Sequence, residues 1–501
     1  MQLTEGVVRD IYDKLVFKAK LFIHKGKTEK ALLYTHLAAY TSHTFFLHNY
    51  FDLQLETIVK QLSLKIHKVP QYDVKNSSVR CVMLDSLSTL KGGLTTQYIR
   101  AIASAGWSLL YITERPLKSK RHIALYKEIL KFSNITILEV PTHLHGDLRF
   151  QYVYDKVVEY NPSKLYLHLS PYDPFFSAIS YAIPNEITKF YIDYTDHSLA
   201  LGSGSADYFF EFRSKGCSAS IKYRGINKDH IFLHPCYPIM DNEPFVGLPD
   251  ICKGKIIILS GGSYWKIIDE DDTYIKLAAG ILKKHKNVVI LFPGGGEKHY
   301  ISKRLSEHKI EDRFILLPWR KDICQLFERC DIYFNTYPNG GGLMSQYAAH
   351  HSKPILSYHP VGDGPNPVET LVCQIRHTKI SQYGISDFMC EADKLIEDIE
   401  YRKQQGNLIN SCVFGKSKFE SSFIEMSTNF KNIIPFDIEE NVAIREGQIY
   451  ETIKACNVNG DYQMRMVMKL WFDPIIYRSA IIFPFARKIL PKIKRVLFDR
   501  K

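Results

Sequence analysis

Three glycine-containing loops carry the residues with the clearest chemical potential in this sequence. They span residues 90–94, 260–267 and 335–346, and each lies between a short apolar run and a segment with helical spacing. At such a junction, free backbone N–H groups and the dipole of the following helix attract anions. The three loops therefore predict contacts with phosphate groups or sugars.

Two of these loops also contain a lysine. The first includes Lys91, Gly92 and Gly93, and the second includes Gly261, Gly262 and Lys266. Small residues let a pyrophosphate approach the backbone, and a lysine neutralises its charge. The first loop does not match GxGxxG, which disfavours a dinucleotide-binding fold of that type, and a simple glycine turn explains it equally well.

The third loop contains three consecutive glycines before a helix. Its candidate ligand-binding residues are Asn339, Gly340, Gly341, Gly342, Leu343 and Gln346. A run of glycines costs chain entropy, so close contact with a phosphate or a sugar is favoured over a purely structural turn.

A histidine next to an aspartate suggests a proton acceptor. Asp196 and His197 follow a short apolar run at 190–193. Histidine titrates near neutral pH, and an adjacent carboxylate can place its ring for deprotonation of a hydroxyl group. The alternative is a histidine that caps a helix or is satisfied in the core.

The sequence predicts no metal site. An Asp-x-Asp pattern at 269–272 suits the start of a helix near 273, where acidic residues are favoured by the dipole. The ten cysteines contain no CxxC pair, and the histidines lack zinc spacing.

Short apolar runs alternate with helical segments in both halves of the chain. The expected strands lie at 79–84, 107–113, 135–140, 164–169 and 190–193, and then at 255–260, 288–292, 314–317, 332–334 and 354–357. This alternation predicts an α/β protein with two tandem doubly wound, Rossmann-like domains. Ligands of such domains lie at the carboxyl ends of the strands, where the loops above begin.

The chain is expected to have four parts. These are a helical region at 1–75, an acceptor domain at 76–245, a nucleotide-sugar donor domain at 250–440 and a basic helical tail at 441–501. The Pro-containing stretch 235–249 suits a linker. Of the 501 residues, 45% are hydrophobic, which is enough for more than one core and excludes disorder as the main state.

Much of the net charge of +12 lies in the tail, where residues 463–501 hold ten basic residues and two acidic ones. Interleaved aliphatic and aromatic residues predict binding to an anionic membrane surface, although packing against the first domain is an alternative. No apolar run reaches the roughly 18 residues of a spanning helix, and no signal peptide is evident. We therefore expect a cytoplasmic protein with peripheral contact to the inner face of the membrane.

The second half resembles the donor-binding domain of GT-B glycosyltransferases, most closely the O-GlcNAc transferase type and its bacterial relatives. The similarity covers about residues 255–358 and includes Ser-Tyr-Trp-Lys-Ile at 263–267, Leu-Pro-Trp at 317–319 and Asn-Thr-Tyr-Pro-Asn-Gly-Gly-Gly at 335–342. In that family, the residue matching Lys266 contacts the donor diphosphate. The backbone matching 317–320, which includes Pro318 and Trp319, receives uracil, and the third loop holds the phosphates.

This chain departs from the family pattern in the third loop. Gly341, Gly342 and Leu343 stand where the family has His-Thr-Thr, and Gln346 stands where it has an aspartate that binds the ribose. The amide of Gln346 can still bond ribose hydroxyls. Asp196 and His197 are similar to the acceptor-side loop of the same group.

The resemblance implies transfer of a sugar from a nucleotide sugar, UDP-linked in type, to a saccharide acceptor in surface polysaccharide or glycan synthesis. His197 or Asp196 would activate the acceptor, and Lys266 with the glycine-rich helix start would stabilise the diphosphate without a metal or cofactor. The basic tail motivates a lipid-linked acceptor. Two alternatives keep the architecture: a polyol-phosphate transferase, and a non-catalytic partner subunit. Nucleic acid is disfavoured as a partner because the positive charge is concentrated in an apolar tail.

Overall fold

The computed structural model describes residues 4–45, 47, 50–74, 78–88, 93–193, 195–196, 198–240, 243–296, 298–362, 367–372 and 380–438. The predictions that concern Lys91, Gly92, His197 and the tail at 441–501 lie outside these residues. None of the helices in the described ranges combines the length and apolar composition that a membrane span needs.

The first α/β domain is built on a parallel sheet. Its strands are β1 (Arg80–Asp85), β2 (Ser108–Thr113), β3 (Ile135–Glu139), β4 (Lys164–His168), β5 (Thr188–Ile192), β6 (Tyr208–Glu211) and β7 (Ile231–Leu233). They lie in the order β3-β2-β1-β4-β5-β6-β7, with Val82 opposite both Leu110 and Leu165. The central strands are buried on both faces, which is why their sequences are almost continuously apolar.

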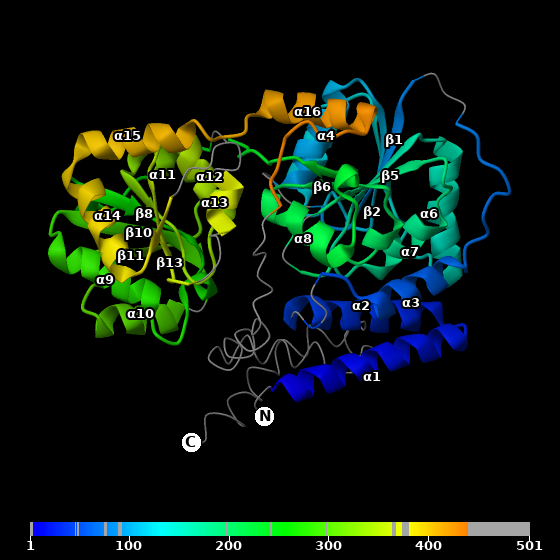
Figure 1. Ribbon diagram of the computed structural model, residues 1–501, viewed down its shortest axis with the longest axis horizontal. Helices are drawn as coiled ribbons and strands as arrows, with labels where there is room; N and C mark the ends of the chain where they lie inside the picture. Colours follow the sequence, from blue (N-terminus) through cyan, green and yellow to red (C-terminus); the bar gives the residue numbers. More distant parts are fainter. Residues whose placement is uncertain are drawn as a thin grey trace.

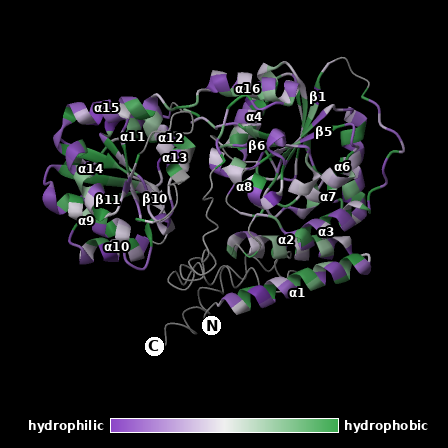
Figure 2. Cartoon of the chain, viewed as in Figure 1, coloured by the Kyte–Doolittle hydropathy of each residue, from purple (hydrophilic) through white to green (hydrophobic). Residues whose placement is uncertain are grey.

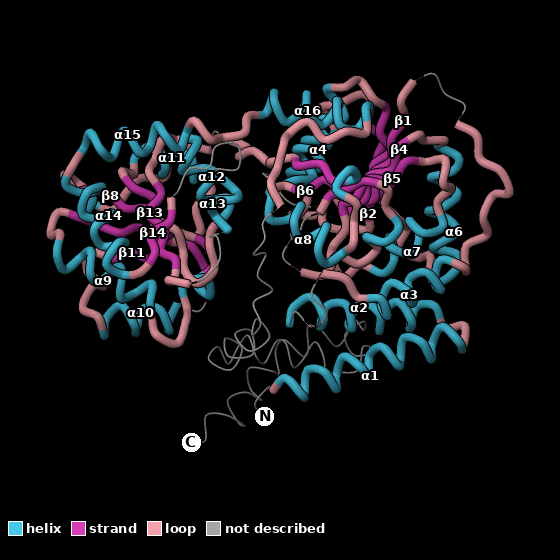
Figure 3. Tube along the Cα trace, in the orientation of Figure 1, coloured by secondary structure: helices cyan, strands magenta, loops and turns pink. Residues whose placement is uncertain are grey.

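Helices cover both faces of this sheet (Figures 1 and 3). They are α4 (Leu94–Ser104), α5 (Ile123–Ile129), α6 (Gly146–Tyr160), α7 (Pro174–Ala182) and α8 (Ser214–Arg224). Local sequence explains where α7 begins. The Asp173 carboxylate accepts hydrogen bonds from the backbone N–H groups of Phe175 and Phe176, and Pro174 occupies the first turn, where no N–H is needed.

The second α/β domain repeats the same architecture. Its strands are β8 (Ile256–Leu259), β9 (Gly262–Ser263), β10 (Val288–Gly295), β11 (Phe314–Leu317), β12 (Ile332–Phe334), β13 (Ile355–His359) and β14 (Ser381–Tyr383). The order is β11-β10-β8-β12-β13-β14, with β9 paired to the end of β10. The helices are α9 (Thr273–Lys284), α10 (Lys298–Glu307), α11 (Ile323–Arg329), α12 (Gly342–His350), α13 (Pro367–Val372), α14 (Ile385–Glu397) and α15 (Ile399–Asn410).

The N-terminal helices and the last described helix belong to the first domain. The helices α1 (Glu5–His24), α2 (Thr28–Phe45) and α3 (Leu53–Ser63) share one hydrophobic core with the first sheet. The same core includes Phe419, Phe423 and Met426 from α16 (Lys416–Asn429), which packs against α4 (Figure 1). Lys164 Nζ also donates a hydrogen bond to the carbonyl oxygen of Ser427 at 2.7 Å.

The prediction of two tandem doubly wound domains preceded by helices is confirmed. The structure differs from the expected division at residue 440, because α16 crosses back and buries its aromatic side chains in the first domain. The strands β6, β7 and β14 were not expected. They contain only three or four residues each, which gives too short a stretch for a clear pattern.

The linker between the two domains forms hydrogen bonds with both of them. After β7, the backbone N–H and carbonyl groups of Tyr237 form two hydrogen bonds with the side-chain amide of Gln97 in α4, at 3.1 and 2.8 Å. Two residues later, the carbonyl oxygen of Ile239 accepts a hydrogen bond from the Tyr347 hydroxyl in α12, at 2.9 Å. The linker is therefore fixed to both domains beside the loops that carry the candidate site.

Candidate functional site

The second glycine-containing loop follows the carboxyl end of β8 and turns sharply. Gly261 and Gly262 have φ values of +148° and +130°, which are conformations that glycine adopts readily. A Cβ on Gly261 would lie 2.8 Å from the carbonyl oxygen of Pro293. The chain then forms β9 and a 3₁₀ turn at Tyr264–Ile267. This turn brings Lys266 to the third glycine loop.

Lys266 is a half-buried cation between the second and third loops. Its Nζ lies 3.4 Å from the carbonyl oxygen of Gly340, and its own carbonyl oxygen accepts a hydrogen bond from the N–H of Asn339 at 3.2 Å. Burial lowers the pKa of its ammonium group. No carboxylate among the described residues forms an ion pair with Lys266. A partly desolvated cation without an anionic partner favours binding of an anion.

The beginning of α12 lies beside this lysine. Gly341 is the N-cap and supplies no side-chain hydrogen bond, so the first turn depends on other acceptors for its N–H groups. The N–H of Gly341 itself donates to Asn335 Oδ1 at 2.8 Å. A helix N-terminus and a lysine at one edge of the sheet together suit a phosphate group.

Packing within the protein also explains why the three consecutive positions are glycines. An added Cβ would lie 2.9 Å from Val368 at Gly340, 2.7 Å from the Tyr333 hydroxyl at Gly341, and 2.5 Å from Leu371 at Gly342. Close packing against β12 and α13 therefore requires small residues here, whether or not a ligand binds. The sequence pattern could not distinguish this packing from ligand contact.

Apolar side chains surround the same edge. Trp265 is 51% exposed, Trp319 is 69% exposed and Leu343 is 45% exposed. Pro318 and Asn339 are exposed too. They come from the loops after β8, β11 and β12, so the structure brings the predicted donor-side residues to one edge. Exposed indole rings next to a cation suit a ligand with both a planar ring and a negative charge.

Gln346 is directed toward the interdomain linker. Its Nε2 donates a hydrogen bond to the carbonyl oxygen of Cys236 at 3.1 Å, and the side chain is 6% exposed. This contact occupies the amide nitrogen in the described conformation. The path of the linker, which the sequence pattern does not reveal, decides this contact.

The loop after β11 is held by a buried ion pair. The Arg320 guanidinium donates to both carboxylate oxygens of Asp322, at 2.7 and 2.6 Å, and to the carbonyl oxygen of Gly247 at 3.0 Å. These hydrogen bonds lower the pKa of Asp322 to about 2. Arg320 therefore fixes the backbone that follows Pro318 and Trp319 against the linker.

On the acceptor side, Asp196 is fully buried and ion-paired. Its carboxylate accepts hydrogen bonds from two nitrogens of Arg213, including Nη2 at 2.6 Å. A carboxylate held by a guanidinium is a weak proton acceptor, so this geometry favours a positioning role for Asp196. His197, its neighbour, lies outside the described residues.

A second buried arginine, Arg224, forms hydrogen bonds with residues of the same loop. Arg224 in α8 donates to Asp193 Oδ2 at 2.6 Å and to the carbonyl oxygens of Thr195 and Ser198 at 3.2 Å. Burial, and then the negative charge of Asp193, raise the pKa of Glu211 well above its usual range. This network fixes residues on both sides of position 197.

Sequence reasoning missed a ring cluster between α2 and the loop after β4. The ring of Tyr172 lies 5.3 Å from His36, 5.1 Å from Tyr40 and 5.7 Å from His43. The carbonyl oxygen of His43 accepts a hydrogen bond from the Ser198 hydroxyl at 2.9 Å, so α2 lies directly beside the acceptor-side loop. The i, i+4, i+7 spacing of the α2 residues is the signal that could have indicated a shared face.

The first glycine loop precedes α4 at the centre of the first sheet. Gly93 is the N-cap of α4 without a side-chain hydrogen bond. Nearby, the buried Asp85 at the end of β1 accepts hydrogen bonds from Thr95, Tyr111 and His168. Strand order reverses between β1 and β4, and ligands of doubly wound sheets bind at that position.

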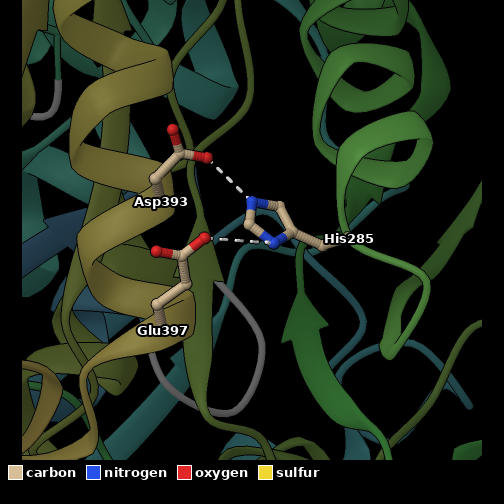
Figure 4. A group of neighbouring side chains, drawn as sticks. All are labelled: His285, Asp393 and Glu397. Carbon is tan, nitrogen blue, oxygen red and sulfur yellow. Dashed lines mark hydrogen bonds and ion pairs between the residues drawn. The ribbon is translucent and has the colours of Figure 1, made fainter.

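His285, Asp393 and Glu397 form a separate titratable group at the end of α9 (Figure 4). The Nε2 of His285 lies 2.7 Å from Asp393, while its Nδ1 lies 3.9 Å from Glu397. One ligand atom from each of the three side chains lies within 4.8 Å of the others, and different ring nitrogens face the two carboxylates. Lys284 Nζ also lies 2.5 Å from Asp393. The group is suited to holding α9 against α14.

Solved structures share this arrangement of domains, although no protein-family model and no curated protein matches the sequence. A point mutant of the O-GlcNAc transferase from Thermobaculum terrenum is similar with a TM-score of 0.51 at 12% identity, covering 92% of this chain and 85% of that one. HepE from Anabaena, in complex with UDP and glucose, has a TM-score of 0.52 at 13% identity, with 70% and 100% covered.

TarM from S. aureus, in complex with fondaparinux, α-GlcNAc-glycerol and UDP, has a TM-score of 0.50 at 9% identity, with 70% of this chain and 99% of that chain covered. Two parallel doubly wound domains, joined by a linker that contacts both, define the fold. The chain has the GT-B glycosyltransferase fold.

Proposed function

We propose that this protein is a glycosyltransferase that uses a UDP-linked sugar as donor. The observation that carries the proposal is the half-buried ammonium group of Lys266, which lies beside the N-terminus of α12 and has no described carboxylate as its ion-pair partner. A diphosphate is the chemical group that satisfies both features. The structures of HepE and TarM, which contain UDP, support the choice of nucleotide.

The donor lies at the carboxyl edge of the second domain in this proposal. Gly261 and Gly262 let the diphosphate approach the backbone, while Lys266 and the N–H groups at Gly342 and Leu343 neutralise it. The nucleobase contacts the backbone at Pro318 and Trp319. Asn339, Gly340 and Gly341 border the phosphates, and the side-chain oxygen of Gln346 is the remaining group for a ribose hydroxyl.

The acceptor lies at the carboxyl edge of the first domain. A saccharide ring is suited to packing on Tyr172 and Tyr40, because sugar C–H groups favour aromatic faces. Lys91, Gly92 and Gly93 belong to this side and contact the acceptor or a phosphate on it. A lipid-linked saccharide used in surface polysaccharide or glycan synthesis is the acceptor class that we propose.

Transfer breaks the bond between the anomeric carbon and the diphosphate oxygen and forms a bond to an acceptor hydroxyl oxygen. His197 takes the hydroxyl proton, and the Asp196–Arg213 pair positions that loop. Lys266 and the start of α12 stabilise the negative charge on the departing UDP. The residues named here require no metal for this step.

The test is thermal unfolding of the full chain with UDP-, GDP-, CMP- and ADP-sugars, compared with Lys266→Ala. A ligand at 100 times its dissociation constant stabilises the fold by about 2.7 kcal/mol. We expect stabilisation by UDP-sugars alone, and its loss in the variant. The absence of any shift would contradict nucleotide-sugar binding and would favour a polyol-phosphate donor or a non-catalytic partner subunit. Sugar transfer itself is then tested by measuring UDP release, which we expect only when an acceptor is added.

A further inference from the structure

Eight lysines lie in two segments of the N-terminal helical layer, at 18–30 and 60–68. They are Lys18, Lys20, Lys25, Lys27, Lys30, Lys60, Lys65 and Lys68, and we call this surface the lysine face. Between residues 18 and 30 and between 60 and 68, the only acidic residue is Glu29. Glu29 accepts a hydrogen bond from the N–H of Gly146 at 2.7 Å. None of the eight lysines forms an ion pair with a carboxylate of the described residues, so the face is strongly basic.

Contacts between helices bring these lysines together. Lys20 Nζ donates to Gln54 Oε1 at 3.1 Å, which joins the end of α1 to α3. The backbone of His67 exchanges two hydrogen bonds with the Gln151 side chain, at 2.8 and 3.1 Å. The Thr28 hydroxyl donates to Asp147 at 2.5 Å. The start of α2 and the segment after α3 therefore both contact the first turns of α6, and α1 packs on α2 and on the start of α3.

Three large apolar side chains are exposed on or beside this face. Phe17 is 67% exposed, Leu64 is 75% exposed and Leu148 is 73% exposed. Each is adjacent in sequence to a cation or lies at the helix ends described above. Figure 2 shows hydrophilic and hydrophobic residues alternating along α1. Exposed apolar groups beside lysines that have no described carboxylate partner suit a surface that meets anionic headgroups.

From this combination we infer that the lysine face binds the surface of an anionic lipid bilayer. Lysines attract anionic headgroups as point charges, while Phe17, Leu64 and Leu148 enter the boundary between headgroups and acyl chains. A nucleic acid would favour arginines and rings that are open to its bases. Segments 18–30 and 60–68 contain no arginine. The stacked rings of Phe22 and Tyr34 are partly buried against the core, with Lys18 and Lys30 over them. Binding here is independent of the tail beyond residue 440 and of the proposed donor site.

The surface also has a geometric consequence. The same helical layer covers the loops after β3, β4 and β5, through the contacts of Gly146 with Glu29, Tyr172 with His36, and Ser198 with His43. Docking through this layer keeps the acceptor side of the protein close to the bilayer. If the proposed function holds, a lipid-linked acceptor is then within reach without leaving the membrane.

The test is co-sedimentation of the full chain with vesicles of phosphatidylcholine and with vesicles of equal parts phosphatidylcholine and phosphatidylglycerol. The test variant is Lys25→Glu, Lys27→Glu, Lys65→Glu and Lys68→Glu combined. The control variant combines Lys253→Glu, Lys303→Glu, Lys403→Glu and Lys416→Glu, whose side chains are 83, 66, 61 and 58% exposed elsewhere. Both variants change net charge equally and leave the tail intact.

We expect the wild type to bind only the anionic vesicles, and the test variant to lose affinity by about tenfold or more, with the control close to wild type. Phe17→Ser with Leu64→Ser should weaken the binding that remains at high salt. Equal binding by the test and control variants, or no vesicle binding by the wild type, would overturn the inference. Binding to single-stranded DNA in preference to vesicles would overturn it in favour of nucleic acid. A UDP-sugar thermal shift retained in the test variant shows that the donor domain is folded.

Discussion

Lys266 and Gly340 are joined across the carboxyl edge of the second sheet, with Lys266 Nζ 3.4 Å from the Gly340 carbonyl oxygen. The N–H of Asn339 returns a hydrogen bond to the carbonyl oxygen of Lys266 at 3.2 Å. Two loops far apart in sequence are thus fixed to each other around one cation. The backbone oxygen is a neutral acceptor and does not compensate the charge of the lysine.

This uncompensated cation should lower the free energy of unfolding of the ligand-free protein. We expect Lys266→Met to raise the free energy of unfolding of the ligand-free protein by about 1 kcal/mol, because a partly buried charge is removed. The same change should lower the rate of sugar transfer about 100-fold, because charge on the diphosphate is no longer stabilised. Urea unfolding and UDP release measure the two effects.

Lys276→Met is the matched control, since Lys276 is exposed on α9 of the same domain. It should leave both quantities unchanged. A Lys266→Met protein that is less stable than wild type, with unchanged transfer, would mean that the lysine is structural.

A second prediction separates packing from ligand contact in the glycine run. A Cβ at Gly341 would lie 2.7 Å from the hydroxyl of the buried Tyr333. Gly341→Ala should therefore destabilise the ligand-free protein by about 1–3 kcal/mol, and Tyr333→Phe in the same chain should recover most of this loss. Gly415→Ala, which has open space around its Cβ, serves as control.

If Gly341→Ala instead leaves the ligand-free stability intact and weakens only UDP-sugar binding, the glycine is required by the ligand. Unfolding curves with and without UDP-sugar distinguish these results.

The framework of the fold could be predicted because local patterns decide it. The strands at 314–317 and 332–334 match the expected bounds, since each is a short apolar run that follows a charged residue and ends before a proline or a polar residue. The positions of Lys266 and the third loop at one edge follow from parallel strands. By contrast, Gln346 meets Cys236 because of the linker path, which depends on contacts between distant segments.

The acceptor side was harder to predict for the same reason. Asp196 was expected to assist catalysis, yet its pairing with Arg213 depends on how α8 packs beneath the loop. The ring cluster around Tyr172 requires α2, which is separated from it by more than a hundred residues. No local pattern indicates that a helical N-terminal region will lie against a loop of the first sheet.

A third prediction concerns the buried Glu56, which joins α3 to the first domain. It accepts hydrogen bonds from the Gly202 N–H at 2.7 Å and from the Tyr181 hydroxyl, and burial raises its pKa to about 7. The unfolded chain releases this proton near pH 4.5, so the folded state binds more protons between about pH 4.5 and 7. The free energy of unfolding should therefore fall by about 1.4 kcal/mol per pH unit as pH rises across that window.

Glu56→Gln keeps an acceptor for Gly202 and cannot titrate. As pH rises from 5 to 8, the wild type should therefore lose stability relative to this variant. This range is roughly the window that the linkage relation predicts. Parallel stability curves would show that Glu56 is ionised throughout.

The last prediction concerns His234, whose ring attaches α16 to the first domain. Its Nε2 donates to the Phe419 carbonyl oxygen at 3.0 Å, and its Nδ1 accepts from the Tyr98 hydroxyl at 3.0 Å. Burial lowers the pKa of His234 to about 3. The unfolded chain binds a proton near pH 6.5 and the folded chain does not. Stability should therefore fall by about 1.4 kcal/mol per pH unit as pH decreases from about 6.5 toward 3.

His234→Gln retains one donor and one acceptor but cannot be protonated. It should lose about 1 kcal/mol at neutral pH through poorer packing against Phe419 and should be less sensitive to acid than the wild type. Hydrogen exchange in α4 and α16 should report the difference. Protonation of Nδ1 removes the acceptor of the Tyr98 hydroxyl in α4 and places a buried charge beside α16, while Nε2 still donates to Phe419. Equal acid sensitivity of the two proteins would place the titrating group elsewhere and would separate the attachment of α16 from the charge of this ring.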